Sequence, residues 1–371
     1  MTAIATVSSV PAQAARLRRG YIDWLRGIAI LIMVEAHTID SWTQAADRST
    51  VWFGRGVILG GFAAPLFLFL AGVAVVLSAS AKARKSDVRT ASRLVQWRGW
   101  QILVFAWLFR LQAMVLSHGS LRGLLKVDIL NIMGPSIVAA AALWGLFRST
   151  RSRAIAFALV TALLSVLTPA VRDAAWLAIL PDPLEAYLRP VGALTNFCIF
   201  PWAGFLAAGA AVGVLLEHAR TVAEERRLNI ALTVAGATLA ATGYFLSFLP
   251  AVFHNASFWT SSPTFFLLRV GILVFGVGVA YAWERLAGDG WSAVREFGHS
   301  SLFVYWIHVE MVYGPLSRSL HRQLSLSQWG MAFALFVAFL FALTTVKNEI
   351  VSRWRRRRAA SPQSSVPSPP S

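Results

Sequence analysis

An apolar stretch over residues 21–40 carries both an arginine and a histidine, Arg26 and His37. Eleven residues separate them, and at about 100° per residue this spacing puts both side chains on one face of a helix. The axial distance between them is then roughly 16 Å. A neutral imidazole accepts a proton near neutral pH, and a guanidinium binds phosphate or carboxylate groups. The pair therefore predicts proton-transfer chemistry beside an anion-binding group.

Two acidic residues, Asp23 and Glu35, lie in the same stretch. Ionisable side chains inside hydrocarbon cost free energy, and they normally face a protein partner or a water-filled cavity. Asp23 precedes Arg26 by three residues, so the two form either a structural ion pair or part of a reactive site. Glu35 lies two residues from His37 and points to another face of the helix. We take Asp23, Arg26 and His37 as candidate catalytic residues.

The composition is that of a polytopic membrane protein. Of the 371 residues 57% are hydrophobic and only 14% are charged, with a mean hydropathy of +0.60, whereas soluble proteins average about 25% charged residues. The net charge of +17 does not predict a nucleic-acid partner, because the basic residues cluster in short loops beside lipid headgroups. The single cysteine, Cys198, excludes an internal disulfide and a cysteine-based metal cluster, and we expect no metal site.

Apolar runs of about 20 residues predict an all-α fold with ten transmembrane helices. The predicted spans are 21–40, 57–79, 94–117, 127–147, 154–172, 192–215, 228–250, 264–284, 299–317 and 329–350. The fifth span ends in a Pro-rich connector and the ninth is short and polar, so these two are the least regular. The first is expected to be a retained span, because Glu35 interrupts it and no signal-peptide cleavage site follows.

We divide the chain into three parts. Residues 1–15 form a disordered N-terminal tail, 16–350 a transmembrane domain, and 351–371 a basic and then Pro/Ser-rich tail. Most of the 34 lysines and arginines fall on one side of the predicted topology, near the two termini and in alternate loops. The positive-inside rule then predicts a multi-pass protein of the inner (plasma) membrane with both termini in the cytoplasm.

This topology assigns a depth to the other polar groups inside the spans. Five of them are expected to converge with His37 in the outer half of the membrane: Arg110, Asn131, Arg269, His308 and Glu310. Arg26 and Arg98 lie toward the cytoplasm. The sequence thus predicts a cavity with a cationic inner mouth and a polar reaction centre farther out. Structural alternatives stay open, since a histidine in a bundle often makes only an interhelical hydrogen bond and an arginine near a span end can extend to the headgroups.

Four segments resemble the transmembrane acyltransferase superfamily, which includes the heparan-α-glucosaminide N-acetyltransferase-like family and the acyltransferase type-three family. An arginine followed after ten residues by a histidine opens that domain, as Arg26 and His37 do here. Residues 64–72 are similar to the Pro-(Leu/Phe)-Phe-x-Phe-x-(Ser/Ala)-Gly signature, and residues 298–308 to the Gly-x-x-Ser-Leu-x-x-Tyr-x-x-His segment. Residues 127–134 resemble a Leu-Gln-x-x-Gly segment of the glucosaminide branch, with Asn131 in place of the glutamine.

The resemblance implies acyl transfer from acyl-CoA, usually acetyl-CoA, to a hydroxyl or amine of a sugar or glycan acceptor, with no permanently bound cofactor. His37 would act as general base or transient acyl carrier, and the candidate catalytic residues are His37, Arg26, His308 and Asp23. The candidates for binding the CoA donor are Arg26, Arg98, Arg110 and Asn131. A homo-oligomer is possible, because the sequence does not determine the oligomeric state.

Two other functions are weighed against this one. A membrane transporter or lipid-linked-sugar flippase is the main alternative, and a non-catalytic sensor or assembly partner is the other. Transporter folds often contain internal repeats and paired broken helices, and we find neither in this sequence. The sequence favours the enzyme, although it does not identify the acceptor or the acyl chain.

Overall fold

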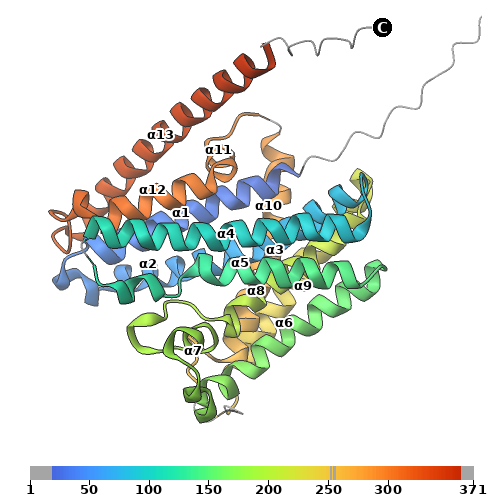
Figure 1. Cartoon of the computed structure of the whole chain (residues 1–371), viewed down its shortest axis with the longest axis horizontal. Coiled ribbons are helices and arrows are strands. Elements are labelled where there is room, and N and C mark those ends of the chain that lie inside the picture. Colours follow the sequence, from blue (N-terminus) through green and yellow to red (C-terminus); the bar gives the residue numbers. More distant parts are fainter. Residues whose placement is uncertain (1–18, 118, 251–252, 254–255, 289, 361–371) are drawn as a thin grey trace, which may run out of the picture.

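The computed structural model describes residues 19–117, 119–250, 253, 256–288 and 290–360. Its helices are α1 (Gly20–Trp42), α2 (Val51–Gly60), α3 (Ala63–Ala83), α4 (Val88–Ser117), α5 (Ile129–Leu146), α6 (Thr150–Asp173), α7 (Asp182–Leu188), α8 (Ile199–His218), α9 (Val222–Leu246), α10 (Pro263–Ala287), α11 (Ala293–His299), α12 (Ser301–Tyr313) and α13 (Leu326–Ala360) (Figure 1). The tail predicted over 1–15 and residues 361–371 of the other tail lie outside the described residues. Residues 351–360 are helical, because α13 continues through them.

Eight helical segments in the described part are long and apolar enough to cross a membrane. The prediction of an all-α polytopic membrane protein is therefore confirmed. Two of the ten predicted spans fall outside this group of eight. Helix α1 has 23 residues but carries four ionisable side chains besides His37, and α12 has only 13 residues.

Three of the predicted spans differ from the helices of the structure. The run predicted over 57–79 is divided between α2 and α3 at residues 61–62. The run predicted over 192–215 becomes α-helical only at Ile199, because residues 194–197 pair with the backbone of Val127. The run predicted over 299–317 leaves the α-helix after Tyr313, where Gly-Pro cannot continue it.

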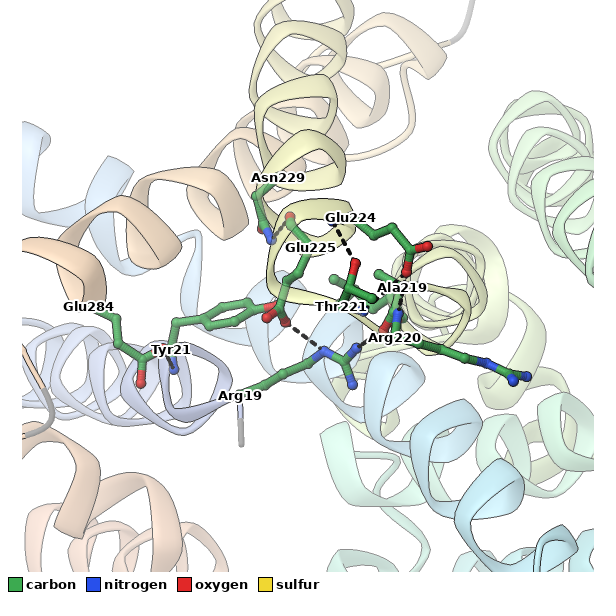
Figure 2. Close-up of polar contacts among 10 residues, drawn as sticks. Arg19, Tyr21, Ala219, Arg220, Thr221, Glu224, Glu225, Asn229 and Glu284 are labelled. Atoms are coloured by element: carbon green, nitrogen blue, oxygen red, sulfur yellow. Dashed lines mark hydrogen bonds and ion pairs between the residues drawn. The ribbon is translucent and has the colours of Figure 1, made fainter. Parts of the chain in front are cut away.

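A polar network fixes the start of α1 against α8, α9 and α10 (Figure 2). The Arg19 guanidinium donates to Glu225 Oε1 at 2.9 Å and to the carbonyl oxygens of Leu216 and Ala219 at 2.5 and 3.0 Å. The Tyr21 hydroxyl donates to the same Glu225 oxygen at 2.9 Å. A cation at the C-terminus of α8 also complements its helix dipole. We call this side of the bundle the Arg19 end.

The other end of α1 is tied to the connection between α12 and α13. Backbone hydrogen bonds join Gln44 N–H to the Leu324 carbonyl at 2.8 Å and Leu324 N–H to the Trp42 carbonyl at 2.9 Å. We call this side the Thr43 end, after the residue that forms an isolated bridge with Leu324. Because α1 is held at both ends, its side chains keep a fixed height in the bundle.

The core of the bundle lies where α3 crosses α8 at close range. A side chain at Gly72 would meet the backbone of Leu206, and one at Gly209 would meet the backbone of Phe69. Small residues let helices approach closely in membrane proteins, where packing rather than hydrophobic exclusion holds them together. This close crossing positions α3, which forms one wall of the cavity described below.

The Arg19 network predicts a large loss of stability in Glu225→Ala. The substitution removes the shared acceptor of Arg19 and Tyr21 in a site where the Glu225 side chain is only 8% exposed. Removing one partner of a buried pair costs about 3 kcal/mol of unfolding free energy, measurable from the midpoint of denaturant unfolding of the purified protein.

The matched control is Glu349→Ala, which removes the same charge from an exposed pair with Arg353. Exposed ion pairs contribute little, so the control should unfold like the wild type. Equal midpoints for the two variants would contradict the role of the network.

Candidate active site

A cavity of about 1060 Å³ extends along one face of α1. Arg26, Met33, His37 and Asp40 of this helix line it, at spacings of seven, four and three residues. Such spacings return to the same side of an α-helix. The two residues singled out in the sequence therefore face a single cavity, with the axial offset that the helix imposes.

The lining of this cavity reaches both ends of the bundle. Toward the Arg19 end it includes Lys82 in the last turn of α3 and Arg98 of α4. Toward the Thr43 end it includes Asn196, before α8, and Pro315, after α12. The Arg19-end mouth is thus cationic, whereas the other mouth combines acidic, basic and amide groups. Molecules approaching from opposite sides of a membrane could meet inside it.

Two histidines form a hydrogen-bonded pair at the wall of the cavity. His37 Nδ1 lies 2.9 Å from His308 Nε2, and the two rings are nearly parallel, with an interplanar angle of 8°. His308 comes from α12 and is fully buried, while His37 lines the cavity. His308 Nδ1 lies 2.8 Å from the carbonyl oxygen of Val304.

These contacts determine which nitrogen of each neutral ring carries the proton. The Val304 carbonyl can only accept, so His308 Nδ1 is the protonated nitrogen and His308 Nε2 is an acceptor. His37 Nδ1 must then donate to His308, which leaves the lone pair on His37 Nε2. A helix carbonyl therefore orients a buried histidine, and that histidine orients a second one whose basic nitrogen is left for a ligand.

Arg26 forms an ion pair with Asp23 of the same helix. Arg26 Nη1 donates to Asp23 Oδ1 at 2.8 Å, and His299 of α11 lies 3.3 Å from the other carboxylate oxygen. Arg26 lines the cavity, but Asp23 does not. The carboxylate is thus placed to orient the guanidinium rather than to contact a molecule in the cavity.

A second polar group lies toward the Thr43 end. Arg110 of α4 forms an ion pair with Asp128, and Asn196 donates to Asp128 Oδ1 at 2.6 Å. All three residues line the cavity together with Lys126. Burial, and then the nearby Arg110 cation, lower the pKa of Lys126 below its usual value. This mouth therefore holds fixed polar groups of both signs.

Comparison with known families decides the class of protein. The family model described as heparan-alpha-glucosaminide N-acetyltransferase, catalytic, matches residues 18–249, more than half of the chain. The chain belongs to this family. The resemblance seen in the sequence is confirmed, and the match is to its glucosaminide branch. No curated protein matches the chain. The matched residues include Arg26, His37, Arg98 and Arg110, whereas His308 follows them.

The other residues expected in the site of this acetyltransferase-family protein are distributed unevenly. Glu310 and Arg98 line the cavity, but Asn131 and Arg269 do not. The expected convergence was wrong for Arg269, whose guanidinium lies 4.1 Å from the centre of the Phe265 ring on α10. Asn131 is buried and accepts a hydrogen bond from Asp128 N–H at 3.0 Å, so it caps the start of α5.

Sequence reasoning missed the aromatic residues around the histidine pair. The Tyr313 ring lies 5.5 Å from the His37 ring, and the Tyr305 ring lies 5.9 Å from the His308 ring. Trp306 Nε1 donates to Gln112 Oε1 at 2.8 Å, which links α12 to α4. A usable signal existed for Tyr305, which precedes His308 by three residues in the 298–308 segment whose resemblance was noted in the sequence. Gln112 had no such signal.

The position of Asn131 predicts a structural effect of its removal. Asn131→Ala deletes the acceptor for Asp128 N–H at the first turn of α5, and loss of such a cap costs about 1 kcal/mol. The unfolding free energy should fall by this amount in denaturant unfolding. An unchanged value would contradict the capping role.

Proposed function

We propose that this protein transfers an acyl group, in the simplest case acetyl, from acyl-CoA to a hydroxyl or amine of a sugar or glycan. The proposal depends on one observation: the Val304–His308–His37 chain leaves a basic nitrogen, His37 Nε2, at the wall of a cavity. Membership of an acetyltransferase family supports the reaction class. A hydroxyl acceptor loses a proton as it attacks a thioester, and a neutral imidazole is suited to take it.

The reaction then proceeds by acyl substitution. The acceptor oxygen or nitrogen attacks the thioester carbonyl while its proton passes to His37 Nε2. The carbon–sulfur bond breaks, the CoA thiolate leaves, and the imidazolium returns the proton to that thiolate. Arg110, which lines the cavity, is the proposed stabiliser of the developing oxyanion. Asn131 lies outside the cavity and is left out of this role.

We propose that the acyl-CoA donor binds at the Arg19 end of the cavity. The phosphates of CoA need cations, and Arg26, Lys82 and Arg98 line that part of the cavity. From Arg26 to His37 the helix rises roughly 16 Å, a distance comparable to an extended pantetheine arm. We infer that this end faces the cytoplasm of a cell with the protein in its inner membrane, and that the acceptor glycan enters from the Thr43 end.

A transporter or flippase remains the competing function, because a cavity lined from both ends would also suit it. The histidine pair favours the enzyme, since transport does not require a basic nitrogen oriented by a buried second ring. An assay of purified protein with acetyl-CoA distinguishes the two, because a transporter would leave the thioester intact.

The histidine pair predicts a graded loss of activity in three variants. His37→Ala removes the base and should lower kcat by at least about 10²-fold. His308→Phe keeps a ring but removes the acceptor that holds the His37 tautomer, so kcat should fall by roughly 10²-fold or more with little change in KM. His308→Gln retains an acceptor oxygen and should keep more activity than His308→Phe.

Steady-state kinetics with acetyl-CoA and an amine or hydroxyl acceptor measure these values, and the pH profile gives a second readout. His37→Ala acting at the wild-type rate would refute the general-base role. Equal losses in the two His308 variants would mean that His308 acts only through packing.

The proposed donor mouth predicts a KM effect in Arg26→Lys. A lysine keeps the charge but loses the planar, bidentate contacts of the guanidinium, so the KM for acetyl-CoA should rise roughly tenfold. The matched control is Arg55→Lys in α2, an exposed residue outside the cavity lining. An equal KM for the two variants would refute the assignment of the donor to the Arg19 end.

A further inference from the structure

A second cavity lies at the Arg19 end, between the α3–α4 turn, the α5–α6 turn and the end of α8. Its volume is about 670 Å³. Four arginines line it, Arg84, Arg89, Arg148 and Arg153, against two acidic residues, Asp87 and Glu217. The formal charge of the lining is therefore positive. The cavity lies where a cluster of cations would meet the headgroups of a membrane.

This cavity is separate from the proposed donor mouth, although both border α3. Ser78 and Lys82 line the first cavity, whereas Ser80 and Arg84 line the second. Residues two apart project from nearly opposite sides of a helix. Within the part of the chain that the structure describes, the two cavities have no lining residue in common. Helix α3 thus forms a wall between them.

The two acidic residues are already engaged. Asp87 accepts hydrogen bonds from Arg89 N–H and Thr90 N–H at 2.8 and 3.0 Å, which caps α4, and these contacts with Thr90 and Arg89 lower the pKa of its carboxyl. Glu217 lies 3.4 Å from Arg84. Among the described residues no carboxylate forms an ion pair with Arg89, Arg148 or Arg153. The guanidinium groups of Arg89 and Arg148 are therefore available to an outside anion, whereas Arg153 is also attracted by the nearby Glu217 charge.

The lining of the cavity includes an anchored arginine and a buried serine hydroxyl. The Arg153 guanidinium stacks over the Trp144 ring at 4.0 Å, and its Nε donates to the carbonyl oxygens of Trp144 and Phe147 at 3.0 and 2.9 Å. These contacts use Nε and leave the two terminal nitrogens of Arg153. Ser80 is 5% exposed, and its hydroxyl has no hydrogen-bond partner in the described structure. An unpaired buried hydroxyl costs free energy, which a bound acceptor oxygen would recover.

We propose that this cavity binds a phosphate ester, and specifically the phosphate of an anionic phospholipid. Arginine forks and a hydroxyl match the several acceptor oxygens of a phosphate. Exposed apolar side chains adjoin the arginines in the sequence: Leu146 and Phe147 precede Arg148, and Ile155 follows Arg153, with exposed fractions of 75%, 37% and 48%. These exposed apolar side chains can contact the acyl chains of a lipid, whereas a soluble phosphate ester has no apolar chain to place against them.

The test is native mass spectrometry of the delipidated, full-length protein. Dioleoylphosphatidylglycerol is titrated against dioleoylphosphatidylcholine, and sn-glycerol 3-phosphate is titrated separately as the soluble ester. We expect one phosphatidylglycerol to be retained in preference to phosphatidylcholine. In the double variant Arg89→Gln/Arg148→Gln its affinity should fall about tenfold or more. Both positions are exposed on the rim, so the variant should fold.

The matched control is Arg220→Gln/Arg355→Gln, which removes two exposed charges outside this cavity. Ser80→Ala tests the buried serine hydroxyl and should weaken binding several-fold without changing the net charge. Equal retention of the two lipids, equal losses in the two double variants, or full retention after Arg89→Gln/Arg148→Gln would overturn the proposal. Displacement of the lipid by sn-glycerol 3-phosphate, lost in the same variant, would support the phosphate site and assign it to a soluble ester.

Discussion

The hydrogen bond between His37 and His308 is the interaction on which the candidate site depends. It connects two helices that are 271 positions apart in the chain, and it has a direction because the Val304 carbonyl can only accept. A lone imidazole on α1 could expose either nitrogen to the cavity. The second ring selects one tautomer, and it does so from a fully buried position that water cannot reach. The proposed chemistry therefore depends on how α1 and α12 pack, and not on α1 alone.

That packing in turn requires α1 to stay at one depth in the bundle. Its many charged side chains make this helix poorly suited to the hydrocarbon core of a membrane. Four ionisable residues besides His37 lie within its 23 residues. Partners offset part of this cost, because Asp23 pairs with Arg26 and His299, and Asp40 pairs with Arg48. The two ends of the helix are held by the contacts of Arg19 and Tyr21 with Glu225 and by backbone bonds to Leu324. The polar network at one end and the backbone bridge at the other fix the height of Arg26 and His37 relative to the cavity. The two cavities at the Arg19 end also share α3 as a wall, so one helix separates the proposed donor mouth from the proposed lipid site.

Much of the fold could be predicted from the sequence. Long apolar runs bounded by basic loops predicted an all-α membrane protein, and the spacing of Arg26 and His37 predicted their common face, because both signals are local and periodic. One boundary failed because of a distant partner: residues 194–197 were predicted to belong to a span, but their backbone pairs with Val127 instead. Depth along a span predicted that Arg110 and Glu310 would reach the cavity, yet it failed for Arg269. Depth does not specify which way a side chain points around the helix.

The sequence by itself therefore determined the class of fold, the family and the two residues of the first helix, since these follow from composition, short motifs and helical periodicity. Tertiary structure decided which of the polar residues meet. It placed Asn131 at a helix cap, paired Asp23 with Arg26, and set His308 against His37 so that one tautomer of His37 is favoured. It also gathered arginines from two short turns around a second cavity. The physical reason is that hydrogen-bond direction and cavity shape arise from the crossing of helices distant in the chain, and no local pattern encodes that crossing.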